Sequence, residues 1–221
     1  MKVIAVNASP RKNFNTSILL AKALEGAQSA DAQTELVHLY ELSFRGCVSC
    51  FACKRGGGEH AGNCALRDDL TDLLERVITS CDVLLLGSPI YLGNVTSAMR
   101  AFLERLIYPN VSYSNEIRSY FPGRIASGFI YTMGLPFQAA QRRGYSYLYE
   151  SNQRYLNLLG APSVYMTVTD TYQFDDYSKY NASNIDAAHK ADVRANQFPA
   201  DCEKAFDMGR TLAIGGKPNF S

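Results

Sequence analysis

The sequence predicts an α/β fold in which a parallel β-sheet is covered by helices on both faces. Strand-like and helix-like patterns alternate along the chain from its first residues. Residues 83–87 form an uninterrupted apolar run, which is typical of a strand buried on both faces. This alternation implies right-handed crossovers between parallel strands. With 221 residues, 47% of them hydrophobic, the chain can bury one full core, so we predict a single domain over residues 1–221.

The first half of the chain contains three of the predicted strands. Residues 3–6 are a short apolar run that ends at the turn residues Asn7 to Pro10. From Thr16 the apolar residues follow helical spacing. The other predicted elements of this half are a strand at 34–39, a helix at 69–79, the strand at 83–87, and a helix at 96–106 that Thr96 caps.

The second half contains two more strands and two irregular segments. We predict a strand at 125–131, a long helix at about 137–159, a strand at 163–168 and a final helix at about 201–213. Residues 109–123 and 171–199 are additions to this pattern. The second is long for a loop, so we expect an extended arm that is functional, forms an interface or is partly mobile.

A loop at 43–66 carries four cysteines in a compact arrangement. Two residues separate Cys47, Cys50 and Cys53 from one another, and Cys64 follows after a glycine-rich stretch. Three close cysteines with a more distant fourth are typical of iron–sulfur clusters, whereas structural zinc sites usually pair two cysteines with two distant ligands. His60 is an alternative ligand, and a solvated loop histidine is the other interpretation. Cys81 and Cys202 are expected to be packing thiols.

The segment from Ser9 to Ser17 joins the first strand to the first helix, where open α/β sheets bind ligands. A helix N-terminus offers free N–H groups to an anion, while Ser9 and Thr16 add hydroxyl groups and Arg11 adds charge. The segment has neither a dinucleotide glycine fingerprint nor a Walker lysine, so it suits a terminal monophosphate, as in FMN. The alternative is a hydrophilic turn that Thr16 caps.

A second ligand loop follows the third strand, at residues 87–94. Pro89 stiffens the chain, Gly93 permits a positive φ, and Tyr91 offers a planar surface. Such a loop can lie along a flat ring. The alternative is an ordinary strand-to-helix turn.

These two loops together, with Arg100, Phe102 and Arg105, resemble the flavodoxin-like NAD(P)H-dependent FMN reductases. The cysteine run up to Cys64, followed by Asp68-Asp69, is similar to the iron–sulfur flavoprotein branch of that family. The resemblance extends over roughly the first 135 residues. It implies a flavodoxin-like three-layer sandwich with a five-stranded parallel sheet in the order 2-1-3-4-5.

The resemblance also implies two cofactor sites and an oligomer. The implied FMN ligands are Ser9, Arg11, Asn13, Asn15, Thr16 and Ser17 in the first loop, Pro89, Ile90, Tyr91, Leu92, Gly93 and Asn94 in the second, and Thr132, Met133 and Gly134 after the fourth strand. The implied ligands of a 4Fe–4S cluster are Cys47, Cys50, Cys53 and Cys64. The implied assembly is a homodimer or a tetramer. Tyrosines at 145–180 would form its surface, or Tyr172, Phe174 or Tyr177 would cover the partner's flavin.

The leading hypothesis is an FMN oxidoreductase that passes electrons between FMN and the cluster. NAD(P)H or a ferredoxin would donate electrons to a quinone or another small acceptor, and no catalytic side chain is required because the cofactors carry the chemistry. One alternative is a cluster-free NAD(P)H-dependent FMN or quinone reductase. A non-enzymatic alternative is a flavodoxin-like electron carrier or FMN-binding interaction protein.

Composition argues against several other classes. The net charge of +1 does not favour nucleic acid or a membrane surface as a partner. The apolar runs are much shorter than the roughly 20 residues that a membrane span needs. The first residues are strand-like and do not resemble a signal peptide, so a cytoplasmic location is expected.

Overall fold

The computed structural model describes residues 1–116 and 118–218 of the chain. Its centre is a parallel sheet of β2 (Gln33–His38), β1 (Lys2–Asn7), β3 (Val83–Tyr91), β5 (Ile125–Thr132) and β6 (Gly160–Val168), in that spatial order. A two-residue strand, β4 (Asn94–Val95), pairs antiparallel with the end of β3. Counted along the chain, the five long strands have the order 2-1-3-4-5, which confirms the predicted topology.

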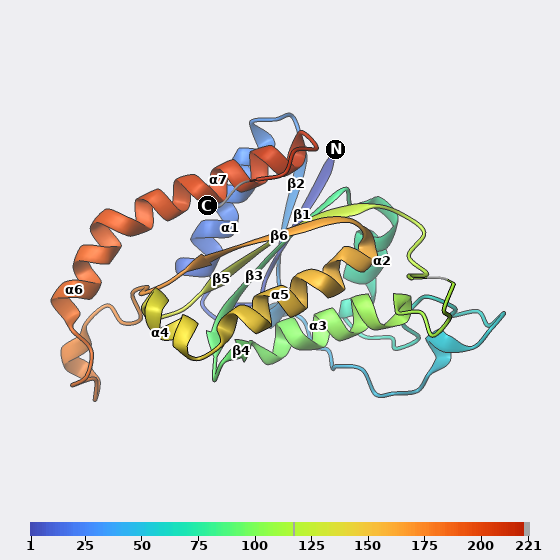
Figure 1. The fold of residues 1–221 in the computed structure, drawn as a ribbon, viewed down its shortest axis with the longest axis horizontal. Coiled ribbons are helices and arrows are strands. Elements are labelled where there is room, and N and C mark those ends of the chain that lie inside the picture. The colour runs from blue at the N-terminus through green and yellow to red at the C-terminus, as the bar shows by residue number, and fades with distance from the viewer. Residues whose placement is uncertain (117, 219–221) are drawn as a thin grey trace.

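Helices cover both faces of this sheet (Figure 1). On one face lie α1 (Asn15–Gln28) and α7 (Phe198–Ala213), and on the other lie α2 (Leu70–Ser80), α3 (Ser97–Ile107) and α5 (Tyr145–Leu156). Side chains alternate between the two faces of a strand, so Val3 and Ala5 join the core under α1 and α7 while Ile4 and Val6 join the opposite core. No helix in the described residues combines the length and the apolar character needed to cross a membrane.

Two glycines allow α1 and α7 to pack with their backbones in close contact. A Cβ on Gly26 would lie 1.9 Å from the carbonyl oxygen of Phe206, and one on Gly209 would lie 1.7 Å from that of Ala23. Neither position can hold a side chain without separating the two helices.

The predicted helix at 137–159 is wrong as a single element. It consists of α4 (Phe137–Arg142) and α5, which are separated at Gly144, where φ is 73°. A left-handed residue ends a helix, and glycine adopts this conformation with little strain. Short 3-10 turns lie at Leu39–Glu41, Ala52–Lys54, Tyr108–Asn110, Asn157–Leu159 and Tyr177–Lys179.

Two other predicted boundaries also differ from the structure. The strand expected from residue 163 begins at Gly160 and includes Pro162, which is tolerated because β6 is an edge strand. The arm at 171–199 is helical in its second half, where α6 (Ala187–Asp192) and a π-helical turn (Val193–Gln197) lead directly into α7. Pro199 cannot donate a helical hydrogen bond, and the wide turn just before it accommodates the proline.

Candidate functional site

The carboxyl ends of β1, β3 and β5 meet at one edge of the sheet and carry the three loops expected to bind a ligand. These loops surround one cavity of about 90 Å³. The predicted residues that line it are Ser9, Arg11, Asn15, Thr16, Pro89, Ile90, Tyr91, Thr132, Met133 and Gly134. Residues from all three predicted loops therefore line one cavity, because the carboxyl ends of parallel strands lie at the same edge of the sheet.

The N-terminus of α1 is the polar end of this cavity. Phe14 occupies the N-cap position and provides no side-chain cap, while Asn15, Thr16 and Ser17 are buried. In the described part of the chain, the N–H groups of these three residues have no hydrogen-bond acceptor. Buried and uncapped N–H groups at a positive helix end are well suited to an anion.

Thr16 is not the helix cap that one interpretation of the sequence proposed. It lies inside α1, and its Oγ1 is 2.8 Å from Oγ1 of Thr132 at the end of β5. This buried contact joins the first loop to the third. Ser9 shapes the same loop, because its Oγ accepts the Arg11 N–H at 3.2 Å.

The second loop is a tight β3–β4 hairpin rather than an irregular segment. Leu92 and Gly93 form its turn with φ values of 51° and 80°, and a two-residue turn of this kind requires positive φ at both positions. The conformation expected of Gly93 is therefore observed. The structure places Leu92, Gly93 and Asn94 at the tip of the hairpin, outside the residues that line the cavity. Leu92 is fully exposed there.

Thr96 connects the second loop to the first and begins α3, as predicted. Its Oγ1 accepts the N–H of Met99 at 3.3 Å and donates to the carbonyl of Ala8 at 3.0 Å. Its own N–H donates to Oγ of Ser88 at 3.0 Å. These bonds hold the N-terminus of α3 beside the cavity.

Sequence reasoning missed the start of the arm as part of this site. Thr171 and Gln173 line the cavity, as does Phe14. Arg11 Nη1 donates to the Gln173 carbonyl at 2.6 Å, and Asn15 Nδ2 donates to the Tyr172 carbonyl at 2.8 Å. The available signals were the length of the arm and its aromatic residues, which in one interpretation would cover a partner's flavin, and neither signal indicates which loop of its own chain the arm contacts.

The other predicted FMN residues lie around this cavity rather than in its wall. Asn13 is exposed on the turn before α1, and Ser17 is buried in the first turn of the helix. The aromatic side chains of the arm pack against one another: the ring of Phe174 stacks on that of Tyr180 and meets that of Tyr177 edge-to-face. Whether they also cover a partner's flavin stays a prediction.

The cysteine loop forms a second candidate site. Cys47, Cys50, Cys53 and Cys64 all line one small hollow. Ser49 and Phe51, which separate the first three cysteines, have φ values of 54° and 56° and turn the backbone around this hollow. His60 lies in a neighbouring hollow instead, beside Cys64. Within residues 1–116 and 118–218, no three histidine, cysteine or acidic side chains are grouped to hold a single metal ion.

Arg105 holds the two ends of the cysteine loop together. Its side chain is fully buried, and its guanidinium donates to Asp68, to the carbonyl of Arg45 before the cysteines and to the carbonyl of Leu66 after them. Burial alone would raise the pKa of Asp68, but the hydrogen bond and charge of Arg105, with the N–H groups of Leu70 and Arg45, lower it below its usual value. Arg105 Nε is buried without a partner in the described residues.

The structure also resolves the role of the acidic pair before α2. Oδ1 of Asp68 accepts the N–H of Leu70 at 3.1 Å, whereas Asp69 occupies the N-cap position and makes no side-chain cap. Asp69 instead accepts the N–H of Ser43 at 2.8 Å. Both aspartates therefore stabilise the base of the cysteine loop.

Lys54 connects the cysteine loop to the segment that follows α3. Lys54 Nζ donates to the carbonyls of Tyr108, Pro109 and Val111, just beyond the end of α3. Burial raises the pKa of the neighbouring Cys53, and the charge of Lys54 opposes that effect. Cys81 is a buried packing thiol, as expected, and burial raises its pKa to about 12.

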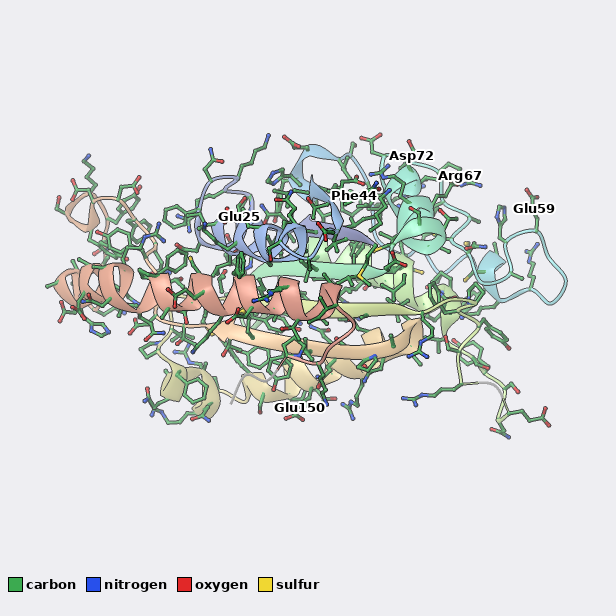
Figure 2. All side chains as sticks on the ribbon, turned by 90° about the horizontal axis from the view of Figure 1, so that it is seen from above. Glu25, Phe44, Glu59, Arg67, Asp72 and Glu150 are labelled. Carbon is green, nitrogen blue, oxygen red and sulfur yellow. The ribbon has the colours of Figure 1, made fainter. Side chains whose placement is uncertain are left out.

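The two candidate sites lie at opposite ends of α3. The N-terminus of this helix contacts the first ligand loop, whereas Glu104 near its other end accepts the N–H of Cys47, and Tyr108 just beyond that end accepts a hydrogen bond from Lys54. The helix has 11 residues and is therefore about 16 Å long. Figure 2 shows Glu59, within the cysteine loop, at one extreme end of the molecule. Cys47 also faces a larger cavity of about 470 Å³ between α3 and α5, so it is accessible from outside.

Comparisons with known sequences find one family model and several relatives that match part of this chain. A family model described as NADPH-dependent FMN reductase matches residues 1–135. An iron–sulfur flavoprotein of Methanocaldococcus jannaschii is 29% identical over 128 residues, which are 58% of this chain and 62% of that protein. An iron–sulfur flavoprotein of Archaeoglobus fulgidus is 34% identical over 107 residues, 48% of this chain and 46% of that protein. The match thus spans about half the length of these curated relatives.

Comparison with solved structures extends the fold similarity over nearly the whole chain. An NAD(P)H:quinone oxidoreductase from Methanothermobacter marburgensis aligns with a TM-score of 0.65 and 16% identity over 96% of each chain. An azoreductase from Bacillus anthracis aligns with a TM-score of 0.65 and 12% identity over 95% of this chain and 98% of that one. At such low identity the similarity concerns the fold alone, and it confirms the flavodoxin-like architecture.

Proposed function

This chain belongs to the NADPH-dependent FMN reductase family, and on that premise we propose that it is an FMN-dependent oxidoreductase. The observation that carries the proposal is the cavity at the carboxyl edge of the sheet, where the uncapped N-terminus of α1 meets the β3–β4 hairpin and the loop after β5. The free N–H groups of α1 suit a phosphate, and Pro89 and Tyr91 in the wall of the same cavity offer surfaces against which the ring of FMN would pack.

Each loop has a distinct part in this proposal. The first-turn N–H groups of α1, with Ser9, Arg11 and Asn15, would bind the phosphate. Pro89 and Tyr91 would pack along the ring. When bound, FMN supplies the capacity to accept two electrons together and to release them singly, while the protein binds and orients it. Arg11 and Asn15 now donate hydrogen bonds to backbone carbonyls of the arm, at Gln173 and Tyr172. To bind a phosphate, these two side chains would have to donate to its oxygens instead.

We also propose that the cysteine loop binds a 4Fe–4S cluster. In such a cluster each cysteine binds a different iron atom, so four thiols must surround one hollow rather than converge on one ion. Cys47, Cys50, Cys53 and Cys64 have that arrangement. The nearby cations Arg105 and Lys54 would offset part of the negative charge of a cluster held by four cysteines, and the unpartnered Nε of Arg105 is a buried donor in the same wall.

The separation of the two sites bears on how electrons would pass between them. Within one chain, an electron would have to travel between the two sites over about the length of α3, roughly 16 Å. We therefore propose that exchange takes place between copies of the chain in a homodimer or tetramer, with the exposed Cys47 and Cys50 facing the partner. NAD(P)H or a ferredoxin as donor, and a quinone or similar small acceptor, complete the proposal.

A cluster-free FMN or quinone reductase is the second candidate function. It is favoured by the exposure of Cys47 and Cys50. In that case the four thiols would be free or redox-active.

A visible spectrum of anaerobically purified protein, with iron and sulfide assays, distinguishes the two candidates. The iron–sulfur proposal expects a flavin spectrum over a broad absorbance, with about four irons per chain. A Cys47→Ala variant should lose the iron and keep the FMN. If anaerobic wild-type protein contains flavin but no iron, the cluster proposal is wrong and the cluster-free reductase is the remaining candidate. If the protein binds no added FMN, both candidate functions are wrong.

A further inference from the structure

One face of the C-terminal helical segment contacts two of the three flavin loops. Lys190 in α6 donates from Nζ to the carbonyl of Gly134 at 2.6 Å, and Arg194 in the π-helical turn donates from Nη1 to Oδ1 of Asn15 at 3.0 Å. The two cations are four residues apart and thus lie on the same side of the helix. Gly134 belongs to the third loop and Asn15 to the first, so one helix face connects both.

Lys190 is held in a buried network rather than in solvent. Only 5% of this residue is exposed, and its ammonium group is paired with the carboxylate of Asp170. The second oxygen of Asp170 lies 2.5 Å from Nε2 of His189. A buried ammonium group is costly unless it is paired and hydrogen-bonded, so this network holds Lys190 on the Gly134 carbonyl.

The backbone around Asp170 is hydrogen-bonded to the third loop. The N–H of Asp170 donates to the Leu135 carbonyl at 2.8 Å, and that of Thr171 donates to the Met133 carbonyl at 3.0 Å. Asp170 has a φ of 58°, a conformation that is uncommon for a residue other than glycine. Strain of this kind is retained where the surroundings fix it, and it clusters at ligand sites.

Arg194 contacts the first loop, at the end of the cavity formed by the N-terminus of α1. Its guanidinium lies over the ring of Phe198, 4.1 Å from the centroid, which restricts its orientation. Because it donates to Oδ1 of Asn15, it leaves the Nδ2 group of that amide directed at the carbonyl of Tyr172, whose two neighbours in the chain, Thr171 and Gln173, line the cavity. The turn that contains Arg194 is π-helical, a form found frequently at functional sites.

We propose that Lys190 and Arg194 are positioning residues that hold the first and third loops of the flavin site in register. Arg194 orients Asn15 at the phosphate end, and Lys190 fixes the Gly134 carbonyl in the loop that faces the ring. Inside the cavity the Thr16–Thr132 contact joins the same two loops, so the helix face acts as an outer clamp. This inference rests on the proposed FMN site and assigns the C-terminal helices to it.

The phosphate end is tested by titrating apoprotein with FMN and with riboflavin, which lacks the phosphate. Arg194→Met should raise the dissociation constant of FMN about tenfold, the equivalent of one hydrogen bond, and change that of riboflavin less than about twofold. Arg194→Lys should recover much of the FMN affinity because it keeps a cation at the same place. The matched control is Arg210→Met, an exposed arginine in α7.

The ring end needs a variant that still folds. Lys190→Met alone would leave the Asp170 carboxylate buried without its partner, so the test uses Asp170→Asn with Lys190→Met, which removes both charges. This double variant should raise the dissociation constants of FMN and of riboflavin by similar factors, about fivefold or more. It should also change the visible circular dichroism of the bound flavin. The matched control is Lys204→Met, an exposed lysine in α7.

The outcomes separate this inference from the function on which it rests. Equal losses of FMN and riboflavin affinity in Arg194→Met would overturn its role at the phosphate. Control-like affinities and flavin spectra in both test variants would overturn the clamp and leave the FMN site intact. A wild-type protein that binds neither flavin would overturn the proposed function and the clamp together.

Discussion

Arg105 and Asp68 form an ion pair at the base of the cysteine loop, with Nη1 at 2.7 and 2.6 Å from the two carboxylate oxygens. The Arg105 side chain is completely buried, and that of Asp68 is 19% exposed. Because the same guanidinium also binds the carbonyls of Arg45 and Leu66, it joins the chain before the first cysteine to the chain after the last. The pair therefore closes the loop into which a cluster would have to fit.

Removing this cation should open the loop. We expect Arg105→Met to lower the free energy of unfolding by about 3 kcal/mol, the low end for a broken buried pair because Asp68 keeps some contact with water. The iron content should fall in parallel. Urea denaturation measures the first effect and an iron assay the second. Arg100→Met is the control on the same helix: its pair with Glu104 is exposed, so a change below about 0.5 kcal/mol is expected. Equal stabilities of the two variants would contradict this role of Arg105.

The same pair predicts a dependence of stability on pH. The pKa of Asp68 is lowered in the folded protein relative to its unfolded value of about 3.9. A lowered carboxyl pKa contributes stability that is fully present above the unfolded value and is lost as the pH falls through the folded value. The stability difference between wild type and Asp68→Asn should therefore be constant above about pH 5 and shrink below about pH 4. Urea denaturation from pH 2 to 7 measures it, and a difference that grows in acid would refute the assignment.

Arg11 tests the phosphate end of the proposed FMN site directly. It lines the cavity and donates to the arm, so Arg11→Met should weaken FMN binding about tenfold and leave riboflavin binding nearly unchanged. Fluorescence titration of apoprotein measures both constants. Lys12→Met is a matched control, because this neighbouring lysine is exposed, pairs with Glu41 and does not line the cavity. Similar FMN affinities in the two variants would argue against phosphate at this loop.

The contact between α1 and α7 should tolerate no side chain at Gly209. A Cβ there would lie 1.7 Å from a backbone oxygen of α1, so Gly209→Ala should cost about 3 kcal/mol or more of stability. It should also weaken FMN binding, since α1 provides the proposed phosphate site. Gly56→Ala provides the comparison, because a Cβ at that position meets nothing within 4 Å. Chemical denaturation of both variants is the measurement, and a Gly209→Ala protein of wild-type stability would contradict the packing.

Much of the architecture was predictable because it depends on local patterns. The apolar run at residues 83–87 and the helical spacing after Thr16 are properties of neighbouring residues, and parallel strands allow few arrangements. Errors arose where one residue changes the backbone, as at Gly144, which divides a predicted helix. They also arose in the polar arm, where α6 has too little apolar periodicity to be recognised.

The fold class and two of the loops at the edge of the sheet follow from the amino-acid sequence, and the resemblance of its motifs to a known family added the order of the strands and the third loop. The packed structure was needed to show that Arg11 contacts Gln173, that Lys190 and Arg194 contact two of these loops, and that Arg105 joins the two ends of the cysteine loop. These contacts join segments distant in sequence, and each depends on where a long side chain ends in space. Periodicity and composition carry no information about such distances, which arise only when the packed sheet brings the segments together.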